Sequence, residues 1–200
     1  SGGNPENIID LTHDYLVEFH KKHYHPSNAT FFTFGNVDPT EIQDFINENV
    51  LKSFQPSSET ISVKNENRIT QPKTITEYYN PMPEDENNHH VVLSWLLGES
   101  HNPVELLESY LVSNILLDNS ASPLRKTLEN TDLGKSLSPL TGLEADHKEL
   151  VFAAGLEGVD SNKQLEVEEL ILNCLKNVVS NGISKELVQS SLHQLEIKQR

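Results

Sequence analysis

The stretch of residues 56–88 constrains the fold more than any other feature of the sequence, because it divides the chain into two parts. Prolines, asparagines and an acidic run interrupt every apolar run within it. Two short pieces, residues 60–63 and 73–79, alternate well enough to predict strands. A composition of this kind is typical of a connector between domains. We therefore expect two structured parts, residues 1–55 and 89–200.

The first part reads as a helix, a strand and a second helix. Thr12 is suited to cap a helix over residues 12–24, where apolar residues recur at helical spacing. Pro26 ends that helix, and the aromatic-rich run at residues 29–35 predicts a buried strand with phenylalanines on both faces. A capping aspartate, a proline and a carboxylate then begin a second helix at residues 38–41.

The second part alternates strands and helices, with an irregular passage after the second helix. The fold class expected for the whole chain is α/β (α+β), with two partial domains, each a mainly antiparallel sheet backed by helices. The expected elements are a strand at 89–98, a helix at 103–119, a short helix from Ser122 to about 134, an irregular passage at 136–142, a strand at 149–158, a helix with a capping box at 161–164 and a stop at Gly182, and a last helix capped by Ser184.

Charge and composition restrict the partners. The 200-residue chain has a formal net charge of −15 and an isoelectric point near 4.9, which argues against nucleic acid and anionic membranes and favours basic partners. No apolar run approaches the roughly 18 residues of a membrane span. A single cysteine excludes an internal disulfide. Cys174 lies on a predicted amphipathic helix, where we expect a small buried apolar side chain.

Five histidines invite a metal-site interpretation. His20 and His23 share a helix face, but His25 lies beyond the helix end beside Pro26. The competing interpretation is a helix that ends in a polar turn. His89 and His90 point to opposite faces of a strand, so they do not chelate one ion together.

A search for catalytic motifs finds none. The sequence lacks both zinc-peptidase histidine motifs, a nucleophile elbow, a phosphate loop and a dinucleotide fingerprint. The run from Gly155 to Gly158 is too short for the last of these. Ser122, near Arg125 and Lys126, is explained more simply as a helix cap than as a nucleophile. We therefore assign no catalytic, cofactor-binding or metal-binding residue to this chain.

Five stretches, in order along the chain, resemble one family of enzymes. They resemble the presequence protease and falcilysin branch of the pitrilysin-like, or insulinase-like, zinc metallopeptidases. The resemblance spans nearly the whole chain. The stretches that carry it are residues 11–36, 91–97, 120–134 with its Ser-Pro-Leu run, 152–159 and 195–200.

The resemblance implies a position within a larger enzyme built from four homologous domains. Residues 1–55 match the C-terminal part of the first peptidase domain, residues 56–88 the connector, and residues 89–200 the N-terminal part of the second domain. The family's inverted zinc motif and third metal ligand lie upstream of the matched part, and its substrate-binding arginine and tyrosine lie far downstream. None of these residues is present here. The chain's start at Ser1 and its lack of a helix stop before Arg200 are what an excised piece would show.

The function implied by the resemblance belongs to the parent protein. It is zinc-dependent endopeptidase action on short unstructured peptides of the targeting class, in the mitochondrial or another organellar matrix. The fragment itself is expected to be inactive and to form a wall of the peptide chamber. Its expected partners are basic unstructured peptides and the rest of the parent chain.

Two other interpretations stay open. One is a non-catalytic structural or peptide-binding relative of the same fold. The other is a small independent metalloprotein that uses His20, His23 and His25. Open sheet edges are adhesive, so the isolated chain is also a candidate dimer.

Overall fold

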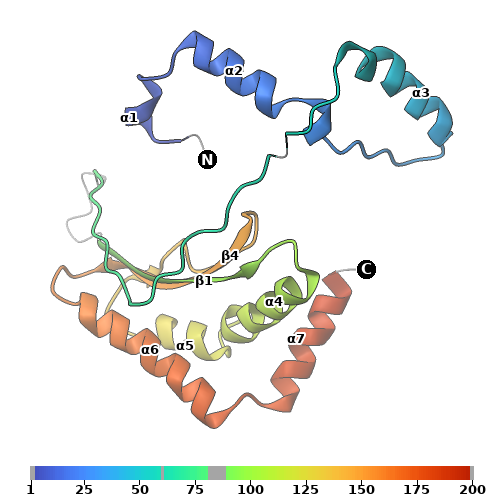
Figure 1. Cartoon of the computed structure of the whole chain (residues 1–200). Helices are drawn as coiled ribbons and strands as arrows, with labels where there is room; N and C mark the ends of the chain where they lie inside the picture. Colours follow the sequence, from blue (N-terminus) through green and yellow to red (C-terminus); the bar gives the residue numbers. More distant parts are fainter. Residues whose placement is uncertain (1–2, 60, 81–88, 199–200) are drawn as a thin grey trace. The chain divides into compact units, whose positions relative to one another are not determined.

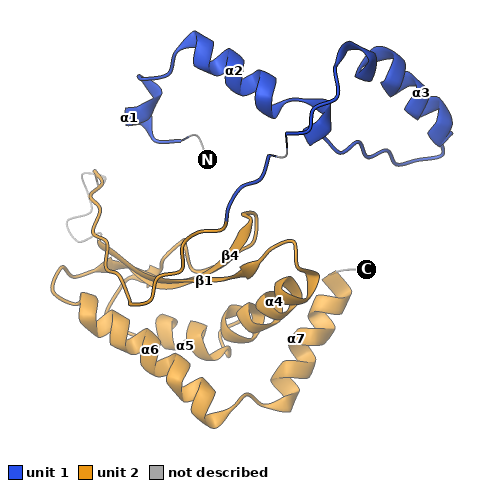
Figure 2. Ribbon diagram, viewed as in Figure 1, with its two compact units in different colours: residues 1–64 blue, residues 65–200 orange. Residues whose placement is uncertain are grey.

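The chain forms two compact units, which divide at residues 64 and 65 (Figure 2). A computed structural model describes residues 3–59, 61–80 and 89–198. The division falls inside the stretch that the sequence marks as a connector. The predicted strand at residues 60–63 lies partly outside the described residues, and neither its described part nor residues 73–79 form a strand. Each unit is described here by itself.

The first unit is helical. The helices begin where local signals predict: Thr12 Oγ1 accepts a hydrogen bond from Tyr15 N at 3.2 Å, and Asp38 Oδ1 accepts one from Thr40 N at 2.8 Å. Both predicted helices of this part are confirmed. The elements are α1 (Pro5–Ile8), α2 (His13–His23), the 3-10 turn η1 (Pro26–Asn28), α3 (Pro39–Asn49) and the 3-10 turn η2 (Leu51–Ser53) (Figure 1).

The strand expected at residues 29–35 is wrong for this chain. The backbone of residues 30–36 makes no hydrogen bond to any described residue. Phe32 is 85% exposed and Phe34 is 93% exposed. A strand needs a partner strand to satisfy its backbone, and the described part of the first unit contains no strand. The apolar alternation is present in the sequence, but no described residue of this unit pairs with it.

The second unit is a small antiparallel sheet backed by helices. The central strand β4 pairs with β1 on one side and with β2 and β3 on the other. This sheet confirms the expected mixed α/β class, whereas the described residues of the first unit form no sheet. The elements are β1 (His89–Glu99), α4 (Pro103–Leu117), α5 (Pro123–Glu129), β2 (Ser136–Leu137), β3 (Gly142–Glu144), β4 (Glu149–Val159), α6 (Gln164–Asn181) and α7 (Lys185–Lys198).

The core of the second unit lies between the sheet and helices α4, α5 and α6, which Figure 1 shows on one side of the sheet. Alternate residues of β4 face these helices, as the two-residue period of a strand requires. The ring centroids of Trp95 and Phe152, from paired strands, lie 6.0 Å apart. Leu124 and Leu156 are fully buried, and so is Ile171. Burial of this apolar surface is the main stabilising term for the unit.

Three local predictions had different outcomes. The passage at residues 136–142 is not wholly irregular, because it contains β2 and the first residue of β3; these strands are too short to give a periodic signal. The capping box expected at residues 161–164 is wrong, since α6 begins after Lys163 without a side-chain cap. The last helix is capped as expected, with Ser184 Oγ accepting from Leu187 N at 3.2 Å.

None of the helices in the described residues is long and apolar enough to cross a membrane.

Candidate functional site

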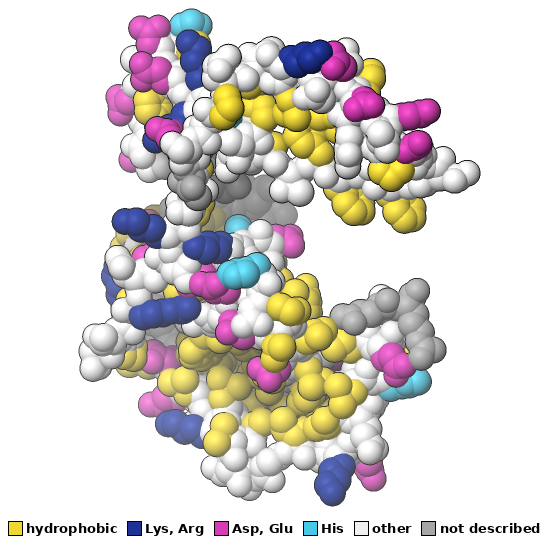
Figure 3. Space-filling model, turned by 45° about the vertical axis from the view of Figure 1, so that its right-hand side comes forward, with side chains coloured by type: hydrophobic (Ala, Val, Ile, Leu, Met, Phe, Trp, Pro, Cys, Tyr) yellow, Lys and Arg dark blue, Asp and Glu magenta, His cyan; other side chains and the backbone are white. Residues whose placement is uncertain are grey.

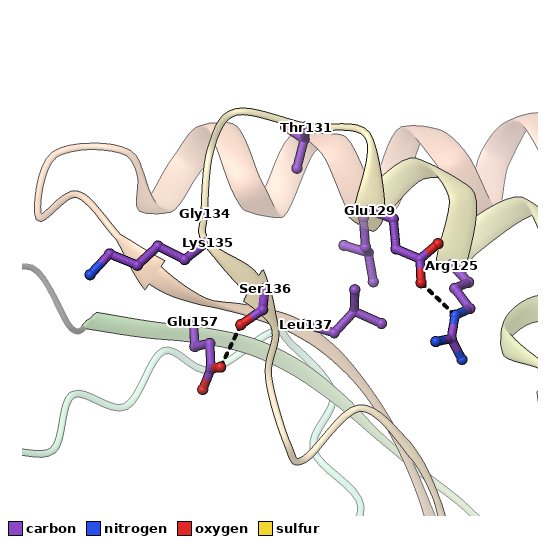
Figure 4. A pocket seen from close by; sticks show the side chains of 9 residues that line it. Arg125, Glu129, Thr131, Gly134, Lys135, Ser136, Leu137 and Glu157 are labelled. Atoms are coloured by element: carbon purple, nitrogen blue, oxygen red, sulfur yellow. Dashed lines mark hydrogen bonds and ion pairs between the residues drawn. The ribbon is translucent and has the colours of Figure 1, made fainter. Parts of the chain in front are cut away.

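A hollow of about 480 Å³ opens at one end of the second unit, between α5, the following loop and β2 (Figure 4). Its wall is contributed by three consecutive segments and one residue of β4. Six of the lining side chains are polar or charged and two are apolar. The residues that line it are Arg125, Leu128, Glu129, Thr131, Gly134, Lys135, Ser136, Leu137 and Glu157.

A glycine brings the wall of the hollow against the sheet. A Cβ atom at Gly134 would lie 2.9 Å from the Glu157 carbonyl oxygen and 2.9 Å from Leu156 Cβ. Any side chain at this position would therefore push the loop away from β4. One residue further on, Lys135 N donates a hydrogen bond to the Glu157 carbonyl oxygen at 2.8 Å. This approach starts the pairing of β2 with β4 and fixes the position of the hollow.

The polar side chains of the hollow hold one another in place. Arg125 Nε donates to Glu129 Oε1 at 2.7 Å, across one turn of α5. Ser136 Oγ donates to a carboxylate oxygen of Glu157 on the neighbouring strand. Leu128, only 2% exposed, is one of the two apolar side chains in the lining.

A second hollow, of about 400 Å³, lies within the first unit, where α2 ends and η2 follows α3. Its lining is mostly apolar and includes Phe31 and Phe54. The ring of His25 meets that of Phe54 edge to face, with centroids 5.3 Å apart. Apolar side chains thus line this hollow next to residues 30–36, whose backbone is unpaired within the described residues.

The three histidines of the possible metal site have separate partners. His20 stacks on Tyr24 with ring centroids 4.9 Å apart, and His23 stacks on Phe19 at 4.0 Å. His25 Nδ1 lies 2.8 Å from Ser27 Oγ. In residues 3–59, 61–80 and 89–198 no three His, Cys, Asp or Glu side chains are grouped closely enough to hold a metal ion. These residues therefore do not fit a zinc site, and we derive no zinc chemistry from them.

The other residues considered from the sequence, Ser122, Cys174 and His90, make contacts within the fold. Ser122 precedes α5 as expected, but its fully buried hydroxyl accepts a hydrogen bond from Asn119 N at 3.3 Å instead of capping the helix. Cys174 is 8% exposed, which confirms the expected buried thiol. Its Sγ lies 3.3 Å from Thr127 Oγ1. His90 meets Tyr79 edge to face at 5.7 Å.

Sequence reasoning missed an ion pair that joins the connector, at Arg68, to the sheet. Glu149, 8% exposed at the start of β4, accepts hydrogen bonds from Arg68 Nη2 at 2.8 Å and from Glu66 N at 2.6 Å. Arg68 Nη2 also donates to the Leu97 carbonyl oxygen at 2.6 Å. Partners more than 80 residues apart give no local signal, and only the fold brings them together.

A second contact of the connector, made by Asn65, lowers the pKa of a carboxyl group on the sheet. Asn65 donates a side-chain hydrogen bond to Glu99, at the end of β1, and this bond lowers the pKa of the Glu99 carboxyl. Burial acts in the opposite direction, and the nearby His101, whose Nε2 lies 3.2 Å from Glu99 Oε2, lowers the pKa further. Residues 65–68 are therefore part of the second unit in both packing and electrostatics.

The described residues of the second unit define a class: a helix-backed antiparallel α/β domain. The family model described as "Peptidase M16 inactive domain" matches residues 10–195, and the chain belongs to this family.

Individual relatives indicate which branch of this family the chain resembles. The mitochondrial presequence proteases of Aspergillus oryzae and Xenopus tropicalis are each 35% identical to it, over 100% of this chain and 20% of theirs. Protein HypA of Clostridium perfringens is 31% identical, over 100% of this chain and 21% of its own. The chain spans about a fifth of the length of these relatives. The resemblance to the presequence protease branch is thus confirmed.

Proposed function

We propose that this chain is a non-catalytic part of a zinc-dependent metalloendopeptidase that degrades short unstructured peptides, and that it forms a wall of the chamber in which they bind. The observation that carries the proposal is the match of the inactive-domain model across residues 10–195. Presequence protease is the name of relatives that are similar over the whole chain. The zinc and its ligands belong, in this proposal, to the parent protein outside these 200 residues.

Charge supports basic peptides as the substrates. A net charge of −15 makes the chain a favourable surface for cationic segments and raises their local concentration. Peptides that direct proteins to an organelle are the class we propose. The compartment we propose is the mitochondrion, which is the one named for the Aspergillus and Xenopus relatives.

The first unit supports a role as part of a larger protein. None of its described residues is buried, and large apolar side chains stand exposed on it (Figure 3). Phe32 and Phe34 lie on the unpaired segment, and Phe45 of α3 is 64% exposed. Exposed apolar surface of this kind is typical of an interface. We propose that the rest of the parent chain covers this apolar surface.

Hydrolysis of a quenched fluorescent peptide with a basic, unstructured sequence tests the proposal. The 200-residue chain is compared with a longer polypeptide that contains it together with the preceding domain. We expect no hydrolysis by the chain, with or without added zinc. We expect hydrolysis by the longer polypeptide that a chelator abolishes and zinc restores. Hydrolysis by the chain alone would contradict a non-catalytic role.

Two further outcomes separate the alternatives. A longer polypeptide that binds the peptide but never cleaves it would replace the enzyme with a non-catalytic relative. One equivalent of zinc per chain, lost when His20, His23 and His25 are changed to Ala, would favour an independent metalloprotein.

A further inference from the structure

The connector runs beside β1 in the antiparallel direction. Three contacts join the two segments, and residue numbers rise along the connector as they fall along β1, which is the order of an antiparallel pair of strands. The contacts are the hydrogen bond of Asn65 to Glu99, that of Arg68 Nη2 to the Leu97 carbonyl oxygen at 2.6 Å, and the edge-to-face contact of Tyr79 with His90, whose ring centroids lie 5.7 Å apart. The sheet thus holds this part of the connector at both ends.

A bend accounts for the length of the connector between these contacts. Between the second and the third contact the connector advances 11 residues, whereas β1 advances seven. The chain bends at residues 70 and 71, just before Pro72. This bend takes up the four extra residues, so residues 73–79 match residues 90–96 of β1 in number.

The backbone of β1 is free on the side away from β4. Among the described residues the only strand that pairs with β1 is β4, in which Gly155 lies opposite Val92. Gly155 N donates to Thr141 Oγ1 at 3.1 Å, and its carbonyl oxygen accepts from Ser138 N at 3.0 Å, so both groups point away from β1. Val92 and Gly155 are therefore a non-hydrogen-bonded pair, and the N–H and C=O of Val92 point to the free edge. Those of Ser94, two residues further in an unbroken register, do the same.

Residues 73–79 are suited to pair with this edge. Five of the seven are threonine, isoleucine or tyrosine, which favour strands. The backbone of residues 73–78 makes no hydrogen bond to the backbone of any described residue. Counted back from the contact of Tyr79 with His90, Ile75 comes opposite Ser94 and diagonal to Leu96. Ile75 is 66% exposed and Leu96 is 37% exposed, so pairing would cover apolar surface on both side chains.

We propose that residues 73–79 form a strap, which closes onto the free edge of β1 as an antiparallel strand with Ile75 opposite Ser94 and Glu77 opposite Val92. The strap is unpaired in the structure, and the bonds of residues 65–68 to the sheet keep it beside the edge at high effective concentration. A closed strap occupies the backbone groups that an extended segment of another chain would use, so it controls whether β1 can accept such a segment. The inference goes beyond the proposed function and does not depend on it.

Disulfide formation within the 200-residue chain tests the register of the strap. In the double variant Ile75→Cys/Ser94→Cys the two cysteines lie opposite each other, at the Cα separation of about 5.5 Å that a disulfide accepts. In the matched control, Thr74→Cys/Ser94→Cys, the first side chain lies on the other face of the strand. With oxidised glutathione and dilute protein, we expect the first variant to form its intrachain disulfide at least about tenfold faster, measured by peptide mass spectrometry. The fluorescence of Trp95 verifies that both variants are folded.

Amide hydrogen exchange of the unmodified chain provides a second test, because it needs no substitution. In the proposed register the N–H groups of Ile75 and Glu77 bond to β1, and those of Thr76 and Tyr78 point to solvent. After correction for their intrinsic rates, we expect the first two to exchange at least about tenfold more slowly than the other two, measured by NMR.

Equal rates of disulfide formation in the two double variants would overturn the proposal, since an unpaired tether brings residues 74 and 75 to Ser94 equally often. Equal exchange of the four amides would also overturn it. Both outcomes are independent of the hydrolysis test, which concerns the proposed function alone.

Discussion

Replacing Gly155 by alanine tests how closely β1 and β4 approach each other. Gly155 is opposite Val92 in the pairing of the two strands. On its other side, the hydroxyl of Thr141 lies 3.1 Å from Gly155 N and 3.2 Å from its carbonyl oxygen. A displacement of Gly155 therefore disturbs both β1 and the loop between β2 and β3, which carries Thr141.

The expected cost follows from the space around Gly155. A Cβ atom would lie 2.3 Å from the Val91 carbonyl oxygen and 2.8 Å from Val92 Cα, where ordinary contact is 3.4–4 Å. Both neighbours are backbone atoms, so no side chain can rotate away and the strands must separate. Overpacking of this kind costs about 1–3 kcal/mol, and relief of glycine entropy returns about 0.5–1 kcal/mol. We expect a net loss of roughly 1 kcal/mol, which lowers Tm by about 2–4 °C.

Urea unfolding followed by Trp95 fluorescence measures this loss. Trp95 is the single tryptophan of the chain and packs in the second unit, so its signal reports that unit alone. Ser94→Ala is the control, because Ser94 is exposed on β1 and its change is expected to stay within about 0.5 kcal/mol. A Gly155→Ala variant as stable as the control would refute the reasoning, since it would mean that the strands do not approach as closely as the structure shows.

Three further predictions concern the connector, the thiol and one acid. Arg68→Ala is expected to lower the free energy of unfolding of the second unit by about 1 kcal/mol, because the Glu149 carboxylate loses one of its two hydrogen-bond donors among the described residues and keeps Glu66 N. The loss is modest because Arg68 is half exposed. An unchanged urea midpoint would contradict this prediction. Cys174 is expected to react with a thiol reagent only as fast as the chain unfolds, and rapid labelling of the native chain would show that it is not buried. Because the pKa of Glu99 is lowered in the folded state, the unfolded state binds more protons in acid. The Glu99 carboxyl therefore stabilises the fold at pH values above its unfolded pKa. This contribution is lost as the pH falls through the lower folded pKa. Asn65→Ala is therefore expected to flatten the fall in unfolding free energy below about pH 4.5, and an identical acid dependence in both proteins would exclude the effect.

The sequence alone determined where the helices begin and which segments are apolar. Thr12 and Ser184 bond to backbone N–H groups three residues away, and Asp38 bonds to one two residues away, so their effect is complete within one turn. The long strands β1 and β4 were recognised as continuous apolar runs. The ordered motifs were enough to indicate the family that the comparison over residues 10–195 confirmed.

Only the tertiary structure decided which strands pair, where the hollow lies and what Glu149 contacts. The close approach of Gly134 to β4 and the pairing of Arg68 with Glu149 join residues far apart in sequence, and neither leaves a periodic pattern. The same dependence explains the error at residues 29–35. Their alternation predicts a strand, but a strand exists only when another strand satisfies its backbone, and the described residues of the first unit provide none. Helix caps act locally and can be read from the chain, whereas a sheet forms only between segments that the fold brings together.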